Sequence, residues 1–68
     1  MERVARVSEI IAGSPISFEE AIKVGFDRAN RTLRNITGLR LLEQRVSVKD
    51  GNIGEYRVRM EVIFVLEA

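Results

Sequence analysis

The side chains of this chain that could do chemistry are arginines and carboxylates, because the sequence contains no cysteine and no histidine. Thiolate and imidazole metal ligands are therefore excluded, and so is a histidine general base. No motif places a serine, threonine, lysine, tyrosine or acidic residue beside a group that could activate it. The sequence therefore predicts a binding protein and not an enzyme.

The basic residues are mostly arginines, whose planar guanidinium group suits ion pairs at interfaces and the recognition of phosphate. They are Arg3, Arg6, Arg28, Arg31, Arg34, Arg40, Arg45, Arg57 and Arg59, with Lys23 and Lys49 as the lysines. For most of these arginines we expect pairing with nearby carboxylates. The formal net charge is only +1, so neither nucleic acid nor an acidic membrane surface is expected as a partner.

The length limits what the chain can do alone. Its 68 residues predict a single domain over residues 1–68. A domain of this size buries only about 60% of its unfolded surface, and small scaffolds usually need disulfides, metals or oligomerisation. Without cysteine, a homo-oligomer is the expected solution. No apolar run approaches membrane-spanning length and the N-terminus does not resemble a secretory signal, so a cytoplasmic location is expected.

The first half of the chain predicts a strand followed by a helix. Residues 4–12 are rich in β-branched side chains and end at Gly13-Ser14-Pro15, where proline stops the ladder. Ser17 and Glu20 have the spacing of a capping box. Helical spacing then joins the apolar residues Phe18, Ala21, Ile22, Phe26, Ala29, Leu33 and Ile36. We expect Gly38 to end this helix in a left-handed cap.

The second half predicts a β-hairpin. Residues 39–48 and 54–66 read as long strands, and Asp50-Gly51 between them is typical of a type I′ turn. A two-residue loop places Arg40 opposite Glu61, on the sheet side away from the helix. We expect an ion pair between these two side chains.

The same register places Gln44 opposite Arg57 on that side, and it points Glu43 and Arg45 toward the helix. Charged side chains are unfavourable in that position. A bulge near Leu42 or Val46, or a longer loop that uses Gly54, would relieve the conflict.

The predicted order is β-α-β-β, which places the chain in the α+β class as a three-stranded antiparallel sheet with one helix. The helix can cover only one face of the sheet. The other face is expected to keep Leu42, Ile63 and Val65, and also Val46. Apolar residues on both faces of a sheet predict that another subunit covers the second face.

Several segments, in their order and spacing, resemble one known family over residues 4–66. They are the strand that ends in Gly13-Ser14-Pro15, the capped helix, Thr32-Leu33-Arg34-Asn35-Ile36, Glu43-Gln44-Arg45, the Asp-Gly turn and Tyr56-Arg57-Val58. The chain is similar to dodecins. The resemblance implies a sheet curled around one helix and assembly into a hollow homododecamer.

The sequence departs from flavin-binding dodecins, which carry a flavin-stacking tryptophan at the position of Gly38 and a glutamine at that of Arg57. Arg40 also stands where those proteins usually have an acidic residue. Together these departures resemble the branch called calcium dodecins, so tight binding of FMN or riboflavin is not expected. We expect a cavity at Gly38 lined by Arg40, Gln44 and Arg57, which would suit an anion or a phosphate.

Calcium is the cofactor that this branch would allow. Ca²⁺ takes roughly six to eight oxygen ligands, and Asp50-Gly51-Asn52 is far too short for an EF-hand loop. A metal site would have to combine Glu9, Glu43 or Glu61 from several subunits. Pairing of each carboxylate with a neighbouring arginine is the alternative.

The function expected from these observations is a non-catalytic, self-assembling container that binds or stores a small ligand or ion. Two alternatives remain at this stage. One is a dodecin that binds FMN or riboflavin in a modified pocket. The other is a structural module whose apolar outer face meets a different protein.

Overall fold

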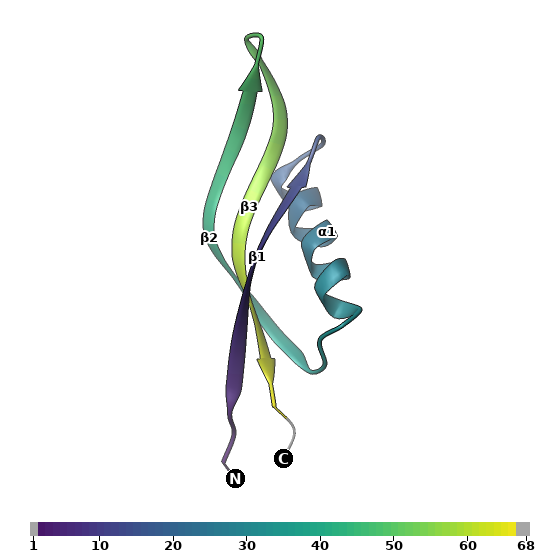
Figure 1. Cartoon of the computed structure of the whole chain (residues 1–68), viewed down its shortest axis with the longest axis vertical. Coiled ribbons are helices and arrows are strands. Elements are labelled where there is room, and N and C mark those ends of the chain that lie inside the picture. Colours follow the sequence, from purple (N-terminus) through teal and green to yellow (C-terminus); the bar gives the residue numbers. More distant parts are fainter. Residues whose placement is uncertain (1, 67–68) are drawn as a thin grey trace.

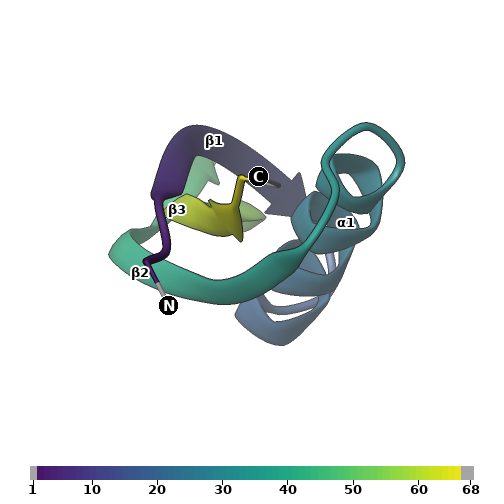
Figure 2. The ribbon, with the colours of Figure 1, turned by 90° about the horizontal axis from the view of Figure 1, so that it is seen from below.

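The fold consists of three strands and one helix, in a computed structural model that describes residues 2–66. The elements are β1 (Ala5–Ser14), α1 (Phe18–Asn30), β2 (Ile36–Lys49) and β3 (Asn52–Val65). The strands form one antiparallel sheet in the order β1-β3-β2, so β3 is central (Figure 1). Figure 2 shows the strands curving around the helix. The predicted α+β fold class is confirmed.

Ser17 caps the N-terminus of α1, since its hydroxyl accepts a hydrogen bond from the Glu20 N–H at 3.0 Å. The buried stripe of α1 consists of Ala21, Gly25 and Ala29. These small residues let the helix lie close to the sheet, since a Cβ on Gly25 would come within 2.6 Å of Met60 Cε. The core is therefore thin.

The helix ends earlier than the sequence predicted. It stops at Asn30, where the N–H groups of Thr32 and Leu33 both bond to the Ala29 carbonyl, and β2 already begins at Ile36. The predicted left-handed cap at Gly38 is wrong, because Gly38 lies inside β2 and has no positive φ. Asn35 takes the left-handed conformation instead, with φ 59. Residues from Asn35 onward pair with the end of β3, and this pairing outweighs the helical spacing of Leu33 and Ile36 that had predicted a longer helix.

The hairpin turn agrees with its prediction. Asp50 and Gly51 have φ values of 53 and 77, and Lys49 pairs with Asn52, as in a type I′ turn. Figure 1 shows that the hairpin of β2 and β3 extends beyond the end of the helix. The molecule is accordingly elongated, with extents of 54 × 20 × 13 Å.

Three irregularities interrupt the pairing of β2 with β3. One of them skips Thr37, between Ile36 and Gly38, and the other two shift the register and then restore it. The first of these two skips Gly54, so that Val48 pairs with Ile53 but Ser47 pairs with Glu55. The second skips Leu42, between Leu41 and Glu43. Between these points the pairing is displaced by one residue, which exchanges the two sides of β2. The predicted bulge near Leu42 occurs. The longer loop that would use Gly54 does not, because the turn keeps two residues and Gly54 lies at another irregularity within the strands.

These two irregularities affect the predicted residue pairs differently along the hairpin. Arg40 pairs with Glu61, as predicted, because it lies beyond both irregularities. Gln44 pairs with Val58 and not with Arg57, so its predicted placement is wrong. Arg45 pairs with Arg57, which moves Glu43 and Arg45 to the side away from the helix.

The core lies between α1 and the sheet. Ala12, Ala21, Val58 and Met60 form its buried centre, with Ile10, Phe18 and Ile22 packed against it. The rings of Phe18 and Tyr56 meet edge to face, 5.2 Å apart. Val46 pairs with Tyr56, so it lies on the helix side and its predicted place on the uncovered face is wrong.

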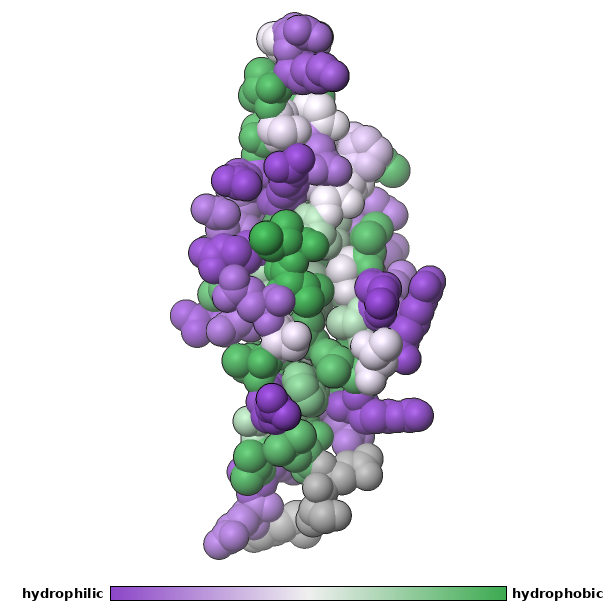
Figure 3. All heavy atoms as spheres, in the orientation of Figure 1, coloured by the Kyte–Doolittle hydropathy of each residue, from purple (hydrophilic) through white to green (hydrophobic). Residues whose placement is uncertain are grey.

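The other side of the sheet, which we call the open face, carries the odd-numbered residues of β3 from Glu55 to Val65 and their partners on β1 and β2. Ile63 and Val65 lie there, as predicted. Apolar side chains remain on the molecular surface among hydrophilic ones (Figure 3). No helix in the described residues has the length and apolar character needed to cross a membrane.

Candidate ligand-binding face

The open face is organised in rows of three residues, one from each strand. From the end of the sheet near the termini toward the hairpin turn, the rows are Val7, Ile63 and Gly38; Glu9, Glu61 and Arg40; Ile11, Arg59 and Glu43; and Gly13, Arg57 and Arg45. We call these the apolar, acidic, central and basic rows. An apolar end is therefore followed by a strongly charged surface.

Ion pairs connect the acidic and central rows. Arg59 Nη1 lies 3.1 Å from Glu9 Oε2, and Arg59 Nε lies 3.9 Å from Glu43 Oε1. Arg40 Nη1 lies 3.7 Å from Glu61 Oε1, which confirms the predicted ion pair. All these side chains are partly or largely exposed, so each pair contributes only about 0–1 kcal/mol to the stability of the isolated chain.

The three predicted metal ligands, Glu9, Glu43 and Glu61, share the open face, and each lies beside an arginine. In residues 2–66 no three acidic side chains gather in a way that could hold a metal ion. Glu9 and Glu61 are direct cross-strand partners, but they supply far fewer oxygens than Ca²⁺ takes. The described part of a single chain therefore does not supply enough oxygen ligands for a calcium ion.

The predicted cavity around Gly38 is not formed by a single chain. Gly38 pairs with Ile63, and Arg57 lies six positions away along β3, which corresponds to about 20 Å. Gln44 lies on the opposite side of the sheet. Of the predicted ligand-binding residues, only Gly38 and Arg40 occupy neighbouring rows. A Cβ at Gly38 would make an ordinary 3.6 Å contact with Ile63 Cδ1, so the position has room for a side chain.

The basic row holds a residue that the sequence reasoning missed. Arg45 lies directly opposite Arg57, whose Nε is 2.5 Å from Glu55 Oε1. Arg45 has no acidic partner in the described part of the chain. Like charges in directly opposed positions are unfavourable, so an anion between these arginines would be stabilising. The signal that could have found Arg45 was Gly54, whose irregularity places it on this face.

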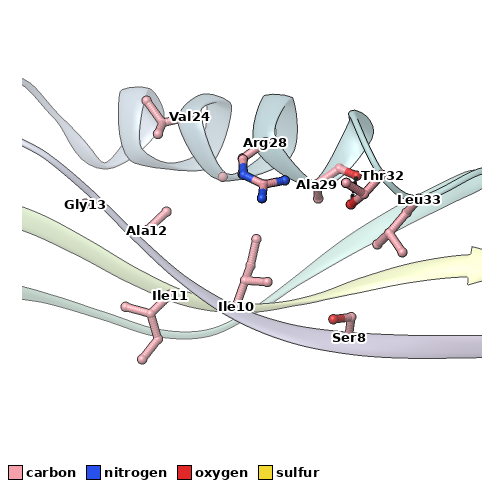
Figure 4. Close-up of a pocket in the computed structure, with 11 residues that line it drawn as sticks. Ser8, Ile10, Ile11, Ala12, Gly13, Val24, Arg28, Ala29, Thr32 and Leu33 are labelled. Carbon is pink, nitrogen blue, oxygen red and sulfur yellow. Dashed lines mark hydrogen bonds between the residues drawn. The ribbon is translucent and has the colours of Figure 1, made fainter.

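A second hollow lies on the helix side, between β1 and α1 (Figure 4). It encloses about 550 Å³ and is lined mainly by apolar residues, including Ile10, Ala12, Val24 and Leu33. The guanidinium group of Arg28 points into it from the helix. None of the predicted ligand-binding or metal-binding residues lines this groove.

Comparison with known proteins identifies the family. The family model described as Dodecin matches residues 4–67. The chain belongs to the dodecin family. The resemblance inferred from the sequence is thereby confirmed, and the β-α-β-β order is that of the dodecin fold.

Two dodecins of known structure or sequence illustrate the likeness. The dodecin of Thermus thermophilus is 33% identical over 67 residues, covering 98% of this chain and 97% of its own. The solved dodecin of Streptomyces davaonensis is 34% identical, covers 100% of both chains and superposes with a TM-score of 0.94. The similarity therefore extends over the whole subunit.

The calcium dodecin of Mycobacterium tuberculosis is a third relative, 34% identical over 61 residues, covering 90% of this chain and 86% of its own. Its structure, described as calcium chelating with a novel calcium-binding site, covers 94% of this chain and 91% of its own, with 35% identity and a TM-score of 0.82. The sequence identities to the dodecin and calcium dodecin relatives are thus about equal. They do not assign this chain to either branch.

Proposed function

We propose that this dodecin assembles into a hollow homododecamer that binds a small anionic ligand at its open face, without catalysing a reaction. The observation that carries the proposal is the basic row, where Arg45 and Arg57 lie opposite each other and Arg45 has no acidic partner in residues 2–66. Arginine presents several donors in a planar fork that matches phosphate and carboxylate. A storage or carrier role follows from such a site in a closed shell.

Assembly is supported by how little the single chain buries. Its buried hydrophobic residues are Ala12, Ala21, Ala29, Val58, Met60 and Val62. On the open face Val7 keeps 55% of its surface exposed and Ile11 keeps 70%. Further copies would remove these side chains from water, at about 25 cal/mol for each Å² of apolar surface.

The separation of the predicted ligand residues also supports assembly. Because Gly38 and Arg57 lie about 20 Å apart within one chain, a small ligand could touch both only where two copies meet. Gly38 offers no aromatic surface for stacking, and Arg57 can only donate hydrogen bonds. We therefore expect the anionic group of a ligand, and not a flavin ring, to provide most of the binding free energy.

Fluorescence quenching of FMN and of riboflavin tests this proposal, because only FMN carries a phosphate. We expect FMN to bind more tightly than riboflavin, and Arg45→Gln to weaken FMN binding about tenfold or more, the effect of losing a charged hydrogen bond. Arg31→Gln, at an exposed position directly after the helix, is the matched control and should leave binding unchanged. Submicromolar binding of riboflavin by the unmodified protein would contradict the proposal and favour the flavin-binding alternative.

Calcium is a second candidate ligand, suggested by the calcium dodecin relative and by the direct pairing of Glu9 with Glu61. A site would need carboxylates from more than one copy, with Glu43 as a further contributor. Calorimetric titration with CaCl₂ tests it, and Glu61→Gln should abolish any heat of binding. Equal heats for the variant and the unmodified protein would exclude these carboxylates as ligands.

A further inference from the structure

We infer that Glu55 is a built-in counter-ion of the basic row, which occupies Arg57 in the ligand-free protein and limits how strongly the row holds a doubly charged anion. The inference rests on the anion site proposed above and adds a specificity-determining residue to it. Two contacts support it, namely the ion pair of Glu55 with Arg57 and the position of the Glu55 carboxylate over Gly13.

The arginines of the open face differ in how their charge is balanced. In the acidic and central rows every arginine is paired with at least one glutamate. In the basic row Arg57 is paired with Glu55, whereas Arg45 has no acidic partner in the described residues. The basic row together with Glu55 therefore carries one net positive charge, and this charge lies at Arg45 on the β2 side.

The Glu55 side chain lies toward the other edge of the sheet. Glu55 and Arg57 are two residues apart on the central strand, so both side chains point to the open face. The Glu55 carboxylate lies over β1, because a Cβ built on Gly13 would be 2.7 Å from Glu55 Cδ and 2.8 and 2.9 Å from its two oxygens. The carboxylate thus turns away from β2 and leaves Arg45 without a counter-charge.

Gly13 provides the space for this arrangement. It has no positive φ, so its backbone does not require glycine. A side chain at position 13 would overlap the carboxylate of Glu55, which lies where the Cβ would be. The end of the flexible Glu55 side chain, and not the backbone, would then have to move. The absence of a side chain at position 13 therefore fixes the place of the counter-ion.

The ion pair uses only part of the Arg57 guanidinium group. Its Nε donates a hydrogen bond to Glu55 Oε1 at 2.5 Å. A guanidinium group has five N–H donors, so the four on Nη1 and Nη2 remain for a ligand. The edge formed by Nε and one Nη, which would suit a bidentate anion, is blocked by Glu55. A bound anion must therefore share Arg57 with Glu55 or displace it.

The charge of the ligand decides how much this competition matters. A singly charged group, such as a carboxylate or a phosphodiester, balances the one net positive charge of the row. A phosphomonoester has a charge of about −2 at pH 8, so one negative charge is left unbalanced beside Glu55. Like charges near a protein surface repel more strongly than they do in bulk water. Glu55 therefore favours singly charged ligands over doubly charged ones.

Glu55 also orients Arg57, so its removal has two opposed effects. The loss of orientation weakens binding only slightly, because the two side chains are 44% and 40% exposed and exposed ion pairs hold a side chain weakly. The loss of repulsion strengthens the binding of a doubly charged anion, and it is the larger effect because two ligand charges are involved. Removing the carboxylate should therefore tighten the binding of such an anion.

Fluorescence titration of Glu55→Gln at pH 8 tests the inference. We expect the variant to bind FMN about tenfold more tightly than the unmodified protein, because a charge repulsion is removed. Its affinity for riboflavin, which has no phosphate, should stay the same, whereas a purely structural role of Glu55 would change both affinities alike. Asp27→Asn is the control, because it removes one negative charge at an exposed position of α1 and should change neither affinity.

Gly13→Ala gives a second test, which keeps the carboxylate in the protein. The added methyl group should push the Glu55 carboxylate away from Arg57 and tighten FMN binding, but by less than Glu55→Gln does. In the double variant Gly13→Ala/Glu55→Gln the alanine should add nothing, because both changes act through the same contact. An alanine effect of full size in the double variant would overturn the position assigned to the counter-ion.

The outcomes separate this inference from the proposed function. If Arg45→Gln weakens FMN binding but Glu55→Gln leaves it unchanged or weakens it too, the anion site stands and the role of Glu55 is wrong. If neither the unmodified protein nor Glu55→Gln binds FMN more tightly than riboflavin, both are overturned. Circular dichroism and light scattering of each variant check that its fold and its assembly are unchanged.

Discussion

At the scale of single residues, we expect Gly38 to limit what the open face can bind. Its backbone does not require glycine, because it lies in β2 without a positive φ, whereas Gly51 in the turn has φ 77. The resemblance to dodecins predicts that a stacking aromatic is missing at Gly38, whereas the prediction of a left-handed cap there is wrong. The backbone conformation at position 38 could not be predicted from the residue type, because glycine is compatible with a left-handed helix cap and with an extended strand.

Gly38→Trp should therefore be tolerated by the fold and should tighten riboflavin binding. An aromatic pair adds roughly 0.5–1.5 kcal/mol beyond area burial, which corresponds to about a twofold to thirteenfold gain in affinity. Fluorescence titration measures the gain, and the melting temperature of the variant should stay within a few degrees of the unmodified protein. A stable variant with unchanged affinity would show that another feature excludes the flavin.

At the scale of secondary-structure elements, the hairpin shows which structural features could be predicted from the sequence. The type I′ turn and the pairing of Arg40 with Glu61 were predicted correctly. The predicted register failed between the irregularities at Gly54 and Leu42, where Gln44 and Arg45 exchange sides. Sequence patterns suggested these irregularities but not that both occur. Each one alone would have moved Arg40 away from Glu61, so their cancellation could be seen only in the structure.

The contact between α1 and the sheet gives a test of packing at the same scale. Gly25→Val should destabilise the fold by about 1–3 kcal/mol, because its side chain would overlap Met60 Cε and the Ala12 methyl group. Chemical denaturation measures the change. Val24→Leu, on the exposed side of the same turn, should change the stability by less than about 0.5 kcal/mol. Equal stability of the Gly25→Val and Val24→Leu variants would show that the core relaxes around position 25.

At the scale of the whole molecule, the thin core leads us to expect that stability depends on assembly. Predicting this needed only the length of 68 residues and apolar side chains on both faces of the sheet. The basic row could not be predicted, because the register error had placed Arg45 on the wrong side of the sheet. The family relationship alone also leaves the ligand undetermined, since the dodecin and calcium dodecin relatives are about equally similar to this chain.

Thermal unfolding should therefore depend on protein concentration. Mass action stabilises a folded oligomer against an unfolded monomer, so the melting temperature should rise when the concentration is increased about a hundredfold. Calorimetry at two concentrations measures the shift, and light scattering should give the mass of twelve 7.7 kDa chains. A melting temperature independent of concentration would show that the single chain is stable by itself.

The irregularities at Gly54 and Leu42 shift the pairing of β2 with β3 by one residue each, in opposite directions, so that the second cancels the first. The register on the two sides of this segment is therefore the same, and only the five residues from Glu43 to Ser47 have their side chains exchanged between the two faces of the sheet. Moving or losing both irregularities would exchange Arg45 for Gln44 on the open face without altering either end of the hairpin. Two dodecins could therefore align without a gap over these residues and still present different side chains to a ligand.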